Sequence, residues 1–333
     1  MKIGSVALTS PFAIAPMAGM TDTAFRRLVK RQGGCGLVVT EMVSAEGLVR
    51  GIDRTLEYAE YTEEERPVSI QIFGGDPGTM AAAAQIVEDM GADIVDVNMG
   101  CPVPKIAKYH AGCSLMREPA QAASVVAAMS RAVKIPVTVK MRAGWNDDER
   151  NAPTLARMMQ DAGAAAVAVH GRTAAQSYSG AADWDLVAQI AGDLTIPVFG
   201  SGDCLEPQQA VDRIRSGVEG VLVGRGVLRN PWILTQAMNL AAGRPLRTVT
   251  LEERGRFLLD YIDLLLQERV REAAGNGRNH DRWVINKLRA LGTYYTKGFE
   301  NGSQLRTALN SAPSLDALRE IISNFFRTAL AWT

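Results

Sequence analysis

The chain has 333 residues, with 36 Lys plus Arg and 36 Asp plus Glu, so its formal net charge at pH 7 is zero. Hydrophobic residues make up 47% and charged residues 22%, which is the ordinary balance of a globular protein. This composition excludes a disordered chain, a collagen-like repeat and a disulfide-dense scaffold. It leaves room for a polyanionic partner, because a whole-chain sum can conceal a basic face.

The N-terminal segment is uncharged from Ile3 to Thr21 and follows Lys2, which loosely resembles a signal peptide. Pro11 and Pro16 interrupt this segment, so we do not expect it to be one. The sequence contains no apolar stretch of about 18 residues and therefore predicts no membrane span.

Eight short, mostly apolar runs predict buried parallel strands, and most are rich in Val and Ile rather than alternating in polarity. They are Phe12–Pro16, Leu37–Glu41, Val68–Phe73, Ile94–Asn98, Val137–Met141, Ala166–His170, Pro197–Gly200 and Gly220–Val223. Helix-period segments lie between them, among them Met80–Met90, Gln121–Val133, Leu155–Ala162 and Pro207–Ser216. The alternation of strand and helix predicts an α/β fold.

The positions of the glycine-rich turns favour a (β/α)8 TIM barrel over residues 1–243. An open doubly wound sheet would carry a glycine-rich phosphate loop after its first strand, but Ala15–Thr21 contains no GxGxxG motif. The turns at Gly200–Asp203 and Gly224–Gly226 instead follow the seventh and eighth strands, where barrels commonly bind phosphate.

The sequence pattern of residues 246–333 predicts a small all-helical domain, which follows a linker at Gly243–Pro245. The helical segments are Leu251–Arg271, Asp281–Tyr295 and Ser314–Leu330, and the sequence between them contains no strand-like run. Residues 245–333 carry 13 Lys plus Arg and 10 Asp plus Glu. This small positive excess is by itself weak support for a nucleic-acid partner, because it is often just a solvated face.

Polar side chains gather at the predicted carboxyl ends of the strands, where barrel enzymes place their chemistry. They include Glu41, Gln71, Asn98, Lys140, Arg142, His170 and Arg172. A scaffold would not need so many polar groups at one rim, although some could simply satisfy backbone groups at strand ends.

Three of these strand-end positions leave alternatives open. Lys140 either points into the barrel mouth toward an anionic partner or extends out to solvent. His170 is either a structural histidine or a ligand contact. Cys101, held between Gly100 and Pro102, is either a buried structural thiol or a proton donor to a substrate carbon.

The four cysteines, Cys35, Cys101, Cys113 and Cys204, form no CxxC pair and match no zinc-site spacing, so we expect no bound metal. Scattered single thiols indicate a reducing setting, and we expect the protein to be cytoplasmic.

Five segments, in order along the chain, resemble the tRNA-dihydrouridine synthase family, and the likeness is greatest to its bacterial B-type branch. They are Ala15–Asp22, Asp96–Pro102, Val139–Trp145, Val169–Thr173 and Gly224–Gly226. The resemblance covers the barrel and continues into the helical part through Tyr294–Gly298. The Asn-x-Gly-Cys-Pro motif at Asn98–Pro102 is its most specific element.

The resemblance implies an FMN-dependent enzyme that uses NADPH, or NADH, to reduce the C5–C6 double bond of uridines in the D-loop of tRNA. It implies Cys101 as the proton donor, and a helical domain that binds tRNA. By matching positions, the flavin contacts would be Pro16, Met17, Ala18, Gln71, Lys140 and His170, and the phosphate end would be held by Ser201, Gly202, Asp203, Gly224 and Arg225. Asn98, Arg142 and Tyr178 would touch the uracil.

Two departures from the family pattern, and two rival functions, stay open at this point. Cys113 stands where a small residue is common, which leaves room for a disulfide to Cys101 or a second thiol, and Ser201 replaces a common asparagine. The rivals are a flavin-free tRNA-binding protein with the same fold and another FMN-dependent barrel oxidoreductase that acts on a small molecule.

Overall fold

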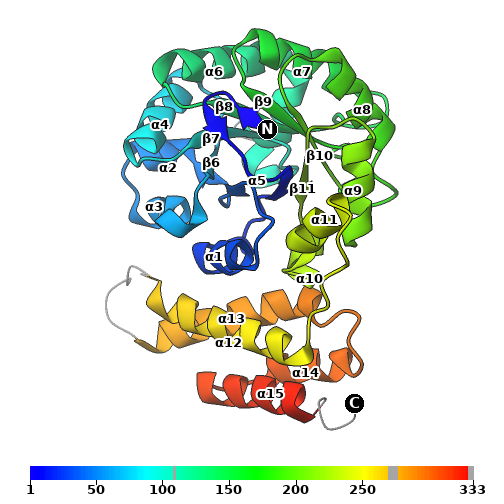
Figure 1. The fold of residues 1–333 in the computed structure, drawn as a ribbon. Helices are drawn as coiled ribbons and strands as arrows, with labels where there is room; N and C mark the ends of the chain where they lie inside the picture. The colour runs from blue at the N-terminus through cyan, green and yellow to red at the C-terminus, as the bar shows by residue number, and fades with distance from the viewer. Residues whose placement is uncertain (108–109, 269–276, 329–333) are drawn as a thin grey trace.

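The structure is a computed structural model that describes residues 1–107, 110–268 and 277–328. Eight parallel strands form a barrel surrounded by helices (Figure 1), which confirms the predicted TIM barrel. In order around the ring they are β3 (Phe12–Ile14), β11 (Gly220–Val223), β10 (Val198–Ser201), β9 (Ala166–His170), β8 (Val137–Arg142), β7 (Ile94–Met99), β6 (Val68–Phe73) and β4 (Val38–Val39). A parallel bridge between Ala13 and Leu37 joins β4 to β3 and completes the ring.

Three strands, β6, β9 and β11, have the predicted bounds, and the other five differ from the predictions by one or two residues at one or both ends. The second strand, β4, is shorter than the predicted Leu37–Glu41, and Glu41 lies beyond it, where its carboxylate accepts a hydrogen bond from Gly19 N–H. A short strand β5 (Val43–Ser44) then pairs with β6. The N-terminus forms an antiparallel hairpin of β1 (Lys2–Ile3) and β2 (Val6–Ala7), which the sequence patterns did not predict.

Helices α1 to α11 connect and cover the strands. Their bounds are α1 Thr23–Gln32, α2 Ala45–Val49, α3 Asp53–Ala59, α4 Pro77–Asp89, α5 Pro104–Ala107, α6 Pro119–Ala132, α7 Ala152–Asp161, α8 Trp184–Asp193, α9 Pro207–Arg215, α10 Arg225–Arg229 and α11 Ile233–Ala241, with 3-10 turns η1 Glu63–Glu65 and η2 Gly112–Arg117. Pro77, Pro119 and Pro207 each stand in the first turn of their helix, where a missing N–H costs little.

Side-chain alternation along the strands separates two cores. The outward residues pack against the helices in one large cluster that includes Ile70, Val97 and Val139. The inward residues form a smaller cluster inside the barrel, which Ile3 of the hairpin joins. On β6, β7 and β8 most inward positions are polar: Ser69, Gln71, Asp96, Asn98, Thr138, Lys140 and Arg142. These three strands therefore alternate in polarity, contrary to the general expectation for the strands.

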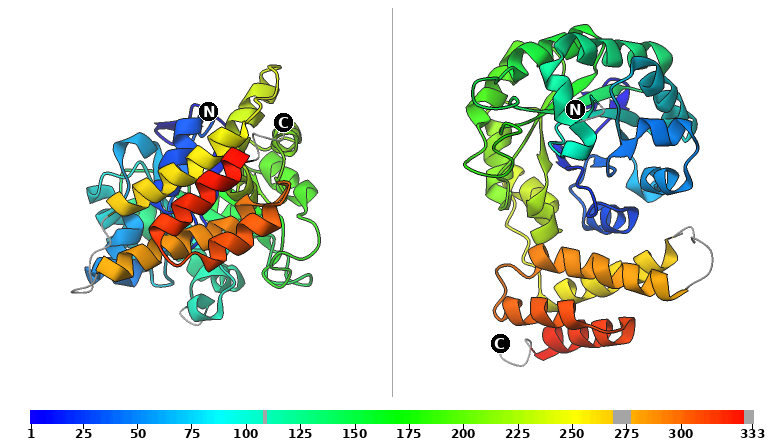
Figure 2. Two further views of the ribbon diagram at one scale, coloured as in Figure 1. Left: turned by 90° about the horizontal axis from the view of Figure 1, so that it is seen from below. Right: turned by 180° about the vertical axis from the view of Figure 1, so that it is seen from behind.

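Four helices follow the barrel: α12 (Leu251–Gln267), α13 (Gly277–Tyr295), α14 (Gly302–Ser311) and α15 (Leu315–Thr328). They lie in two layers, with α12 and α13 nearer the barrel and α14 and α15 beyond them (Figures 1 and 2). The sequence patterns missed α14, and the predicted helix ends at Arg271 and Leu330 fall outside the described residues. The domain division between residues 243 and 246 stays a prediction.

The C-terminal helices pack against the edge of the barrel rim that β3 and β11 form. Helix α12 contacts α1, which follows β3, and α13 contacts α10, which follows β11. The Phe257 ring of α12 lies edge-on to Phe25 of α1, tilted against Trp232 and stacked on Tyr295. No helix within the described ranges is long and apolar enough to cross a membrane.

A buried ion pair fixes α1 to the loop before β6. The Arg26 guanidinium and the Glu65 carboxylate are 2.6 Å apart, and their side chains are 1% and 0% exposed. Arg26 also donates to the carbonyls of Thr21 and Glu60, and Glu65 accepts from Thr62 N–H. Both charges are thus paired and hydrogen-bonded, which a buried pair requires.

Replacing Glu65 with Ala should lower the free energy of unfolding by about 3–5 kcal/mol, because it leaves the Arg26 charge buried without its partner. Urea unfolding of the variant and the wild-type protein measures the difference. Glu46→Ala is the matched control, since its ion pair with Arg50 is exposed and its loss should cost no more than about 0.5 kcal/mol. Equal losses in the two variants would contradict the role of burial.

Candidate active site at the barrel rim

A chain of hydrogen bonds runs from the barrel interior to the Cys101 turn. The Asp96 carboxylate accepts from Thr138 Oγ1 at 2.6 Å and from Gln71 Nε2 at 2.7 Å. Gln71 Oε1 in turn accepts from Asn98 Nδ2 at 2.7 Å. Asn98 Oδ1 accepts from the N–H groups of Gly100 at 3.2 Å and Cys101 at 2.9 Å. Asn98 therefore fixes the backbone of the turn that carries the thiol.

The carboxylate at the base of this chain is buried, and its burial affects its ionisation. Burial raises the pKa of Asp96, while hydrogen bonds from Thr138 and Gln71 and the positive charge of Lys140 oppose the rise. The Asp96 side chain is thus held among donors, as a buried carboxylate requires.

Arg142 secures the same turn from the neighbouring strand. Its Nε donates to the Gly100 carbonyl at 2.8 Å, and its Nη1 donates to the carbonyls of Thr173 and Ser177. Burial lowers the pKa of Arg142, and the nearby Tyr178, Cys113 and Cys101 side chains oppose this effect. The guanidinium therefore holds the carbonyl of the residue that precedes Cys101.

All four cysteines are free thiols, so the disulfide considered between Cys101 and Cys113 is absent. Cys101 is half-buried, whereas the other three are buried. Burial raises the pKa of Cys113 to about 11 and of Cys204 to about 12, so these thiols stay protonated at neutral pH. Only Cys101 combines partial exposure with a place at the rim.

A pocket opens beside this turn, with about 550 Å³ of empty space, part of which is open to solvent. Ten of the residues predicted for the site line it, namely Pro16, Met17, Lys140, His170, Tyr178, Ser201, Gly202, Asp203, Gly224 and Arg225. The register of the strands places the residues that hold the Cys101 turn next to the residues that line the pocket. Asn98 pairs with Lys140, and Arg142 pairs with His170, on adjacent strands.

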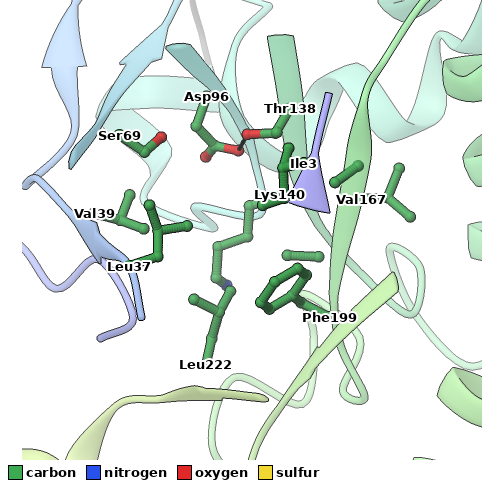
Figure 3. Close-up of a pocket in the computed structure, with 12 residues that line it drawn as sticks. Ile3, Leu37, Val39, Ser69, Asp96, Thr138, Lys140, Val167, Phe199 and Leu222 are labelled. Carbon is green, nitrogen blue, oxygen red and sulfur yellow. Dashed lines mark hydrogen bonds between the residues drawn. The ribbon is translucent and has the colours of Figure 1, made fainter. Parts of the chain in front are cut away.

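Lys140 points into the barrel, which resolves the first alternative left by the sequence. Its side chain extends through a small internal cavity that Asp96 and Thr138 also line, and its amine end lies near Leu222 (Figure 3). Burial, aided by the charge of Arg142, lowers the pKa of Lys140 to about 8. The amine forms no hydrogen bond or ion pair with any residue that the structure describes.

His170 presents an unpartnered ring nitrogen to the pocket. Its Nε2 is buried without a hydrogen-bond partner among the described residues. Burial, together with the positive charges of Lys140 and three arginines, lowers the pKa of His170 to about 2, so the ring is neutral. Its ring centroid lies 6.4 Å from that of Tyr178, whose side chain is 59% exposed. The unpartnered His170 nitrogen is suited to a hydrogen bond with a neutral polar edge of a ligand, and the exposed Tyr178 ring leaves room for a second planar group.

The glycine-rich turns place an aspartate and an arginine, Asp203 and Arg225, in the lining of the pocket. Asp203 accepts from Arg172 Nη2 at 2.7 Å and from Arg225 Nη2 at 3.3 Å. Burial would raise the pKa of Asp203, but the Ala182 N–H and the Arg172 guanidinium hold it below its usual range. A Cβ on Gly202 would lie 2.6 Å from Ala182 Cβ, so only glycine fits this turn.

Five of the predicted site residues do not line the pocket. Cys101, Gln71, Asn98 and Arg142 belong to the hydrogen-bonded group beside it, and Ala18 is exposed on the loop after β3. Site prediction from the sequence missed Asp96, which orients Gln71, and did not select Arg172, which pairs with Asp203. The alternating polarity of Ile94–Asn98 was the available signal for Asp96.

The family model for dihydrouridine synthase matches residues 13–323 of the chain. The chain belongs to the dihydrouridine synthase family. It is 36% identical over 335 residues to a probable tRNA-dihydrouridine synthase of Rickettsia bellii, covering 99% of both chains. It is 37% identical over 338 residues to tRNA-dihydrouridine synthase B of Xanthomonas campestris, covering 99% of this chain and 97% of that one.

Among solved structures, morphinone reductase superposes with a TM-score of 0.51 at 15% identity, covering 74% of this chain and 90% of that one. This likeness supports the barrel fold alone. Membership of the dihydrouridine synthase family makes the chain an oxidoreductase with a flavin cofactor, and it confirms the resemblance that the sequence indicated.

Because the pKa of His170 is about 2 in the folded protein, its neutral state should make the barrel sensitive to acid. The unfolded chain takes up a proton near pH 6.5, so the His170 contribution is present above that pH and is lost as pH falls. Between pH 7.5 and 5 the loss is about 2 kcal/mol. Urea unfolding of flavin-free protein at both pH values should show that His170→Asn loses this much less stability than wild type; parallel losses would contradict the assignment.

Proposed function

We propose that this protein reduces the C5–C6 double bond of uridines in the D-loop of tRNA to 5,6-dihydrouridine, with FMN as cofactor and NADPH, or NADH, as reductant. The observation that carries the proposal is the juxtaposition of the Cys101 turn with a pocket whose Lys140 amine and His170 Nε2 lack partners among the described residues. Such unpartnered polar groups in a concave site are expected where a ligand binds.

The residues of the pocket fit FMN at both ends. Pro16 and Met17 of the pocket would lie along the flavin ring, with Ala18 next to them on the exposed loop. Lys140 and His170 would lie at the polar edge of the ring, which Gln71 would approach from the neighbouring hydrogen-bonded group. A cation at Lys140 stabilises negative charge on the reduced ring, which is how a protein tunes a flavin. Ser201, Gly202, Gly224 and Arg225 would hold the phosphate end, since glycine turns let backbone N–H groups approach closely. When bound, FMN supplies the hydride that adds to C6 of uracil.

Asp203 would contribute to binding the FMN phosphate indirectly, by positioning Arg172 and Arg225. A carboxylate is repelled by a phosphate, so a direct contact between the two is unfavourable. Because Asp203 accepts from both Arg172 and Arg225, it holds the Arg225 guanidinium at the pocket. The Arg225 group also lies 4.8 Å from the Tyr178 ring centroid, which further restricts it.

Cys101 supplies the proton that completes the reduction. Hydride addition at C6 leaves negative charge at C5 and the adjoining carbonyl, and transfer of the thiol proton to C5 forms the second C–H bond. The resulting thiolate is stabilised by the nearby Arg142 guanidinium and regains a proton from solvent. Cys101 therefore acts as a general acid, and its turn is held by Asn98 and Arg142.

Three residues are proposed to meet the uracil, and they differ in what they can still offer. Asn98 uses both ends of its amide within the protein, and Arg142 donates to three backbone carbonyls. Tyr178 keeps an exposed ring at the pocket mouth, where an extruded base can stack on it. Residues 246–333 would then contact the tRNA backbone, which must approach the rim for the base to enter.

Purified protein should contain FMN and absorb visible light, and it should regain one FMN per chain after the cofactor is stripped. Flavin release followed by chromatography identifies FMN. A colourless protein that FMN cannot reconstitute would support the rival role as a flavin-free tRNA-binding protein, and would overturn the proposal.

Cys101→Ala should keep FMN and its reduction by NADPH, yet lose most dihydrouridine formation, by about 10²–10⁴-fold, because the general acid is gone. Mass spectrometry of unmodified tRNA after incubation with each enzyme measures the product and maps its position. Cys113→Ala is the matched control, since that thiol lies on the same loop and is fully buried. Turnover equal to wild type in Cys101→Ala would reject Cys101 as the acid.

A further inference from the structure

Lys287 of α13 reaches from the C-terminal helices to the loop that follows β3. Its Nζ lies 2.9 Å from Asp22 Oδ2 and 3.7 Å from Glu41 Oε1, and it donates to the Gly19 carbonyl at 3.2 Å. Asp22 Oδ2 and the Gly19 carbonyl are within hydrogen-bond distance of the ammonium, and the Glu41 carboxylate at 3.7 Å adds an ion-pair contact. The Lys287 side chain is only 13% exposed, so this contact is largely shielded from solvent.

Two of the acceptors of Lys287, Gly19 and Asp22, belong to the loop after β3, which borders the cofactor pocket. Gly19 lies two residues beyond Met17 and has a φ of +78°, a conformation that favours glycine. Its N–H donates to Glu41 Oε2 at 2.6 Å, while its carbonyl accepts from Lys287. Thr21 Oγ1 closes the turn by bonding Met17 N–H and the Met17 carbonyl. Glu41 and Lys287 thus fix the loop by hydrogen bonds to the N–H and the carbonyl of the same residue, Gly19.

Charge explains why this contact is needed. Asp22 caps α1 through Phe25 N–H and also accepts from the Tyr261 hydroxyl, so it cannot move away. Burial raises the pKa of Glu41, and the charge of Lys287 opposes that rise. Burial alone would lower the pKa of Lys287, but Asp22 and Glu41 raise it above its usual value. Without Lys287, two buried carboxyl groups would face each other beside the loop.

We propose that Lys287 is a positioning residue that holds the Pro16–Met17–Ala18 segment in the conformation that binds the flavin. The C-terminal helices are then part of the framework of the cofactor site, in addition to any role in tRNA binding. The inference rests on the proposed function, because it concerns the affinity of this site for FMN.

The test compares FMN binding by wild type, Lys287→Met and Lys287→Arg, using the quenching of FMN fluorescence as stripped protein is refilled. Lys287→Met should raise the Kd for FMN by about tenfold or more, because the apparent Kd rises as the loop spends less time in the conformation that binds the flavin. Lys287→Arg should restore part of the affinity, and the visible spectrum of the Met variant at saturating FMN should differ from wild type. Arg319→Met is the matched control, because its ion pair with Asp263 joins α15 to α12 away from the barrel and should leave the Kd unchanged.

A second variant covers the case in which Lys287→Met does not fold. Glu41→Gln keeps an acceptor for Gly19 N–H but removes one of the two facing carboxyl groups, so Lys287→Met combined with Glu41→Gln should fold and bind FMN more tightly than Lys287→Met. If the wild-type protein binds FMN and both Met variants bind it equally well, this inference alone fails. If the wild-type protein binds no FMN, the proposed function fails, and this inference fails with it.

Discussion

In a closed ring of parallel strands, every strand ends at the same rim and alternate side chains point into a shared interior. Each feature of the site depends on this constraint. The register that pairs Asn98 with Lys140 and Arg142 with His170 brings four polar groups from three strands to one place. The outward neighbours of the same residues, such as Val97, Val139 and Val169, are fully buried against helices and keep the strands rigid. Along each strand, therefore, the outward side chains pack against the helices and the inward side chains form the site.

The buried hydrogen-bond chain has a direction, and Asp96 sets it. Both oxygens of Asp96 accept hydrogen bonds, one from Thr138 Oγ1 and one from Gln71 Nε2, so Gln71 turns its NH₂ toward Asp96 and its carbonyl toward Asn98. Asn98 must then donate to Gln71 and can offer only its carbonyl to the Cys101 turn. Asp96 thus determines which groups Gln71 and Asn98 present, although it lies below the rim and touches neither Cys101 nor the pocket at the rim.

The strands and the outline of the site could be predicted because both depend on short-range patterns. Runs such as Val68–Phe73 and Ala166–His170 have the predicted bounds, and Lys140 and His170 come at strand ends in the sequence itself. The role of Asp96 was missed because it stands in mid-strand, where only the alternation of polar and apolar residues marks it. The contact between Lys287 and Gly19 could not be predicted, since 268 residues separate them and no local pattern links them.

The zero net charge of the chain also has a different meaning once the contacts are known. The C-terminal segment has a small excess of basic residues, but several of them are already paired: Lys287 with Asp22 and Glu41, Arg319 with Asp263, and Arg247 with Glu253. A cation held between buried carboxyl groups adds little to the potential at the surface. The cations that remain for a phosphate backbone are exposed ones such as Lys297, at the end of α13 beside Arg229 and Arg254 in a groove between the barrel and the helices. The exposed cations therefore decide which partner this segment can bind, whereas Lys287 is already paired with carboxyl groups of the barrel.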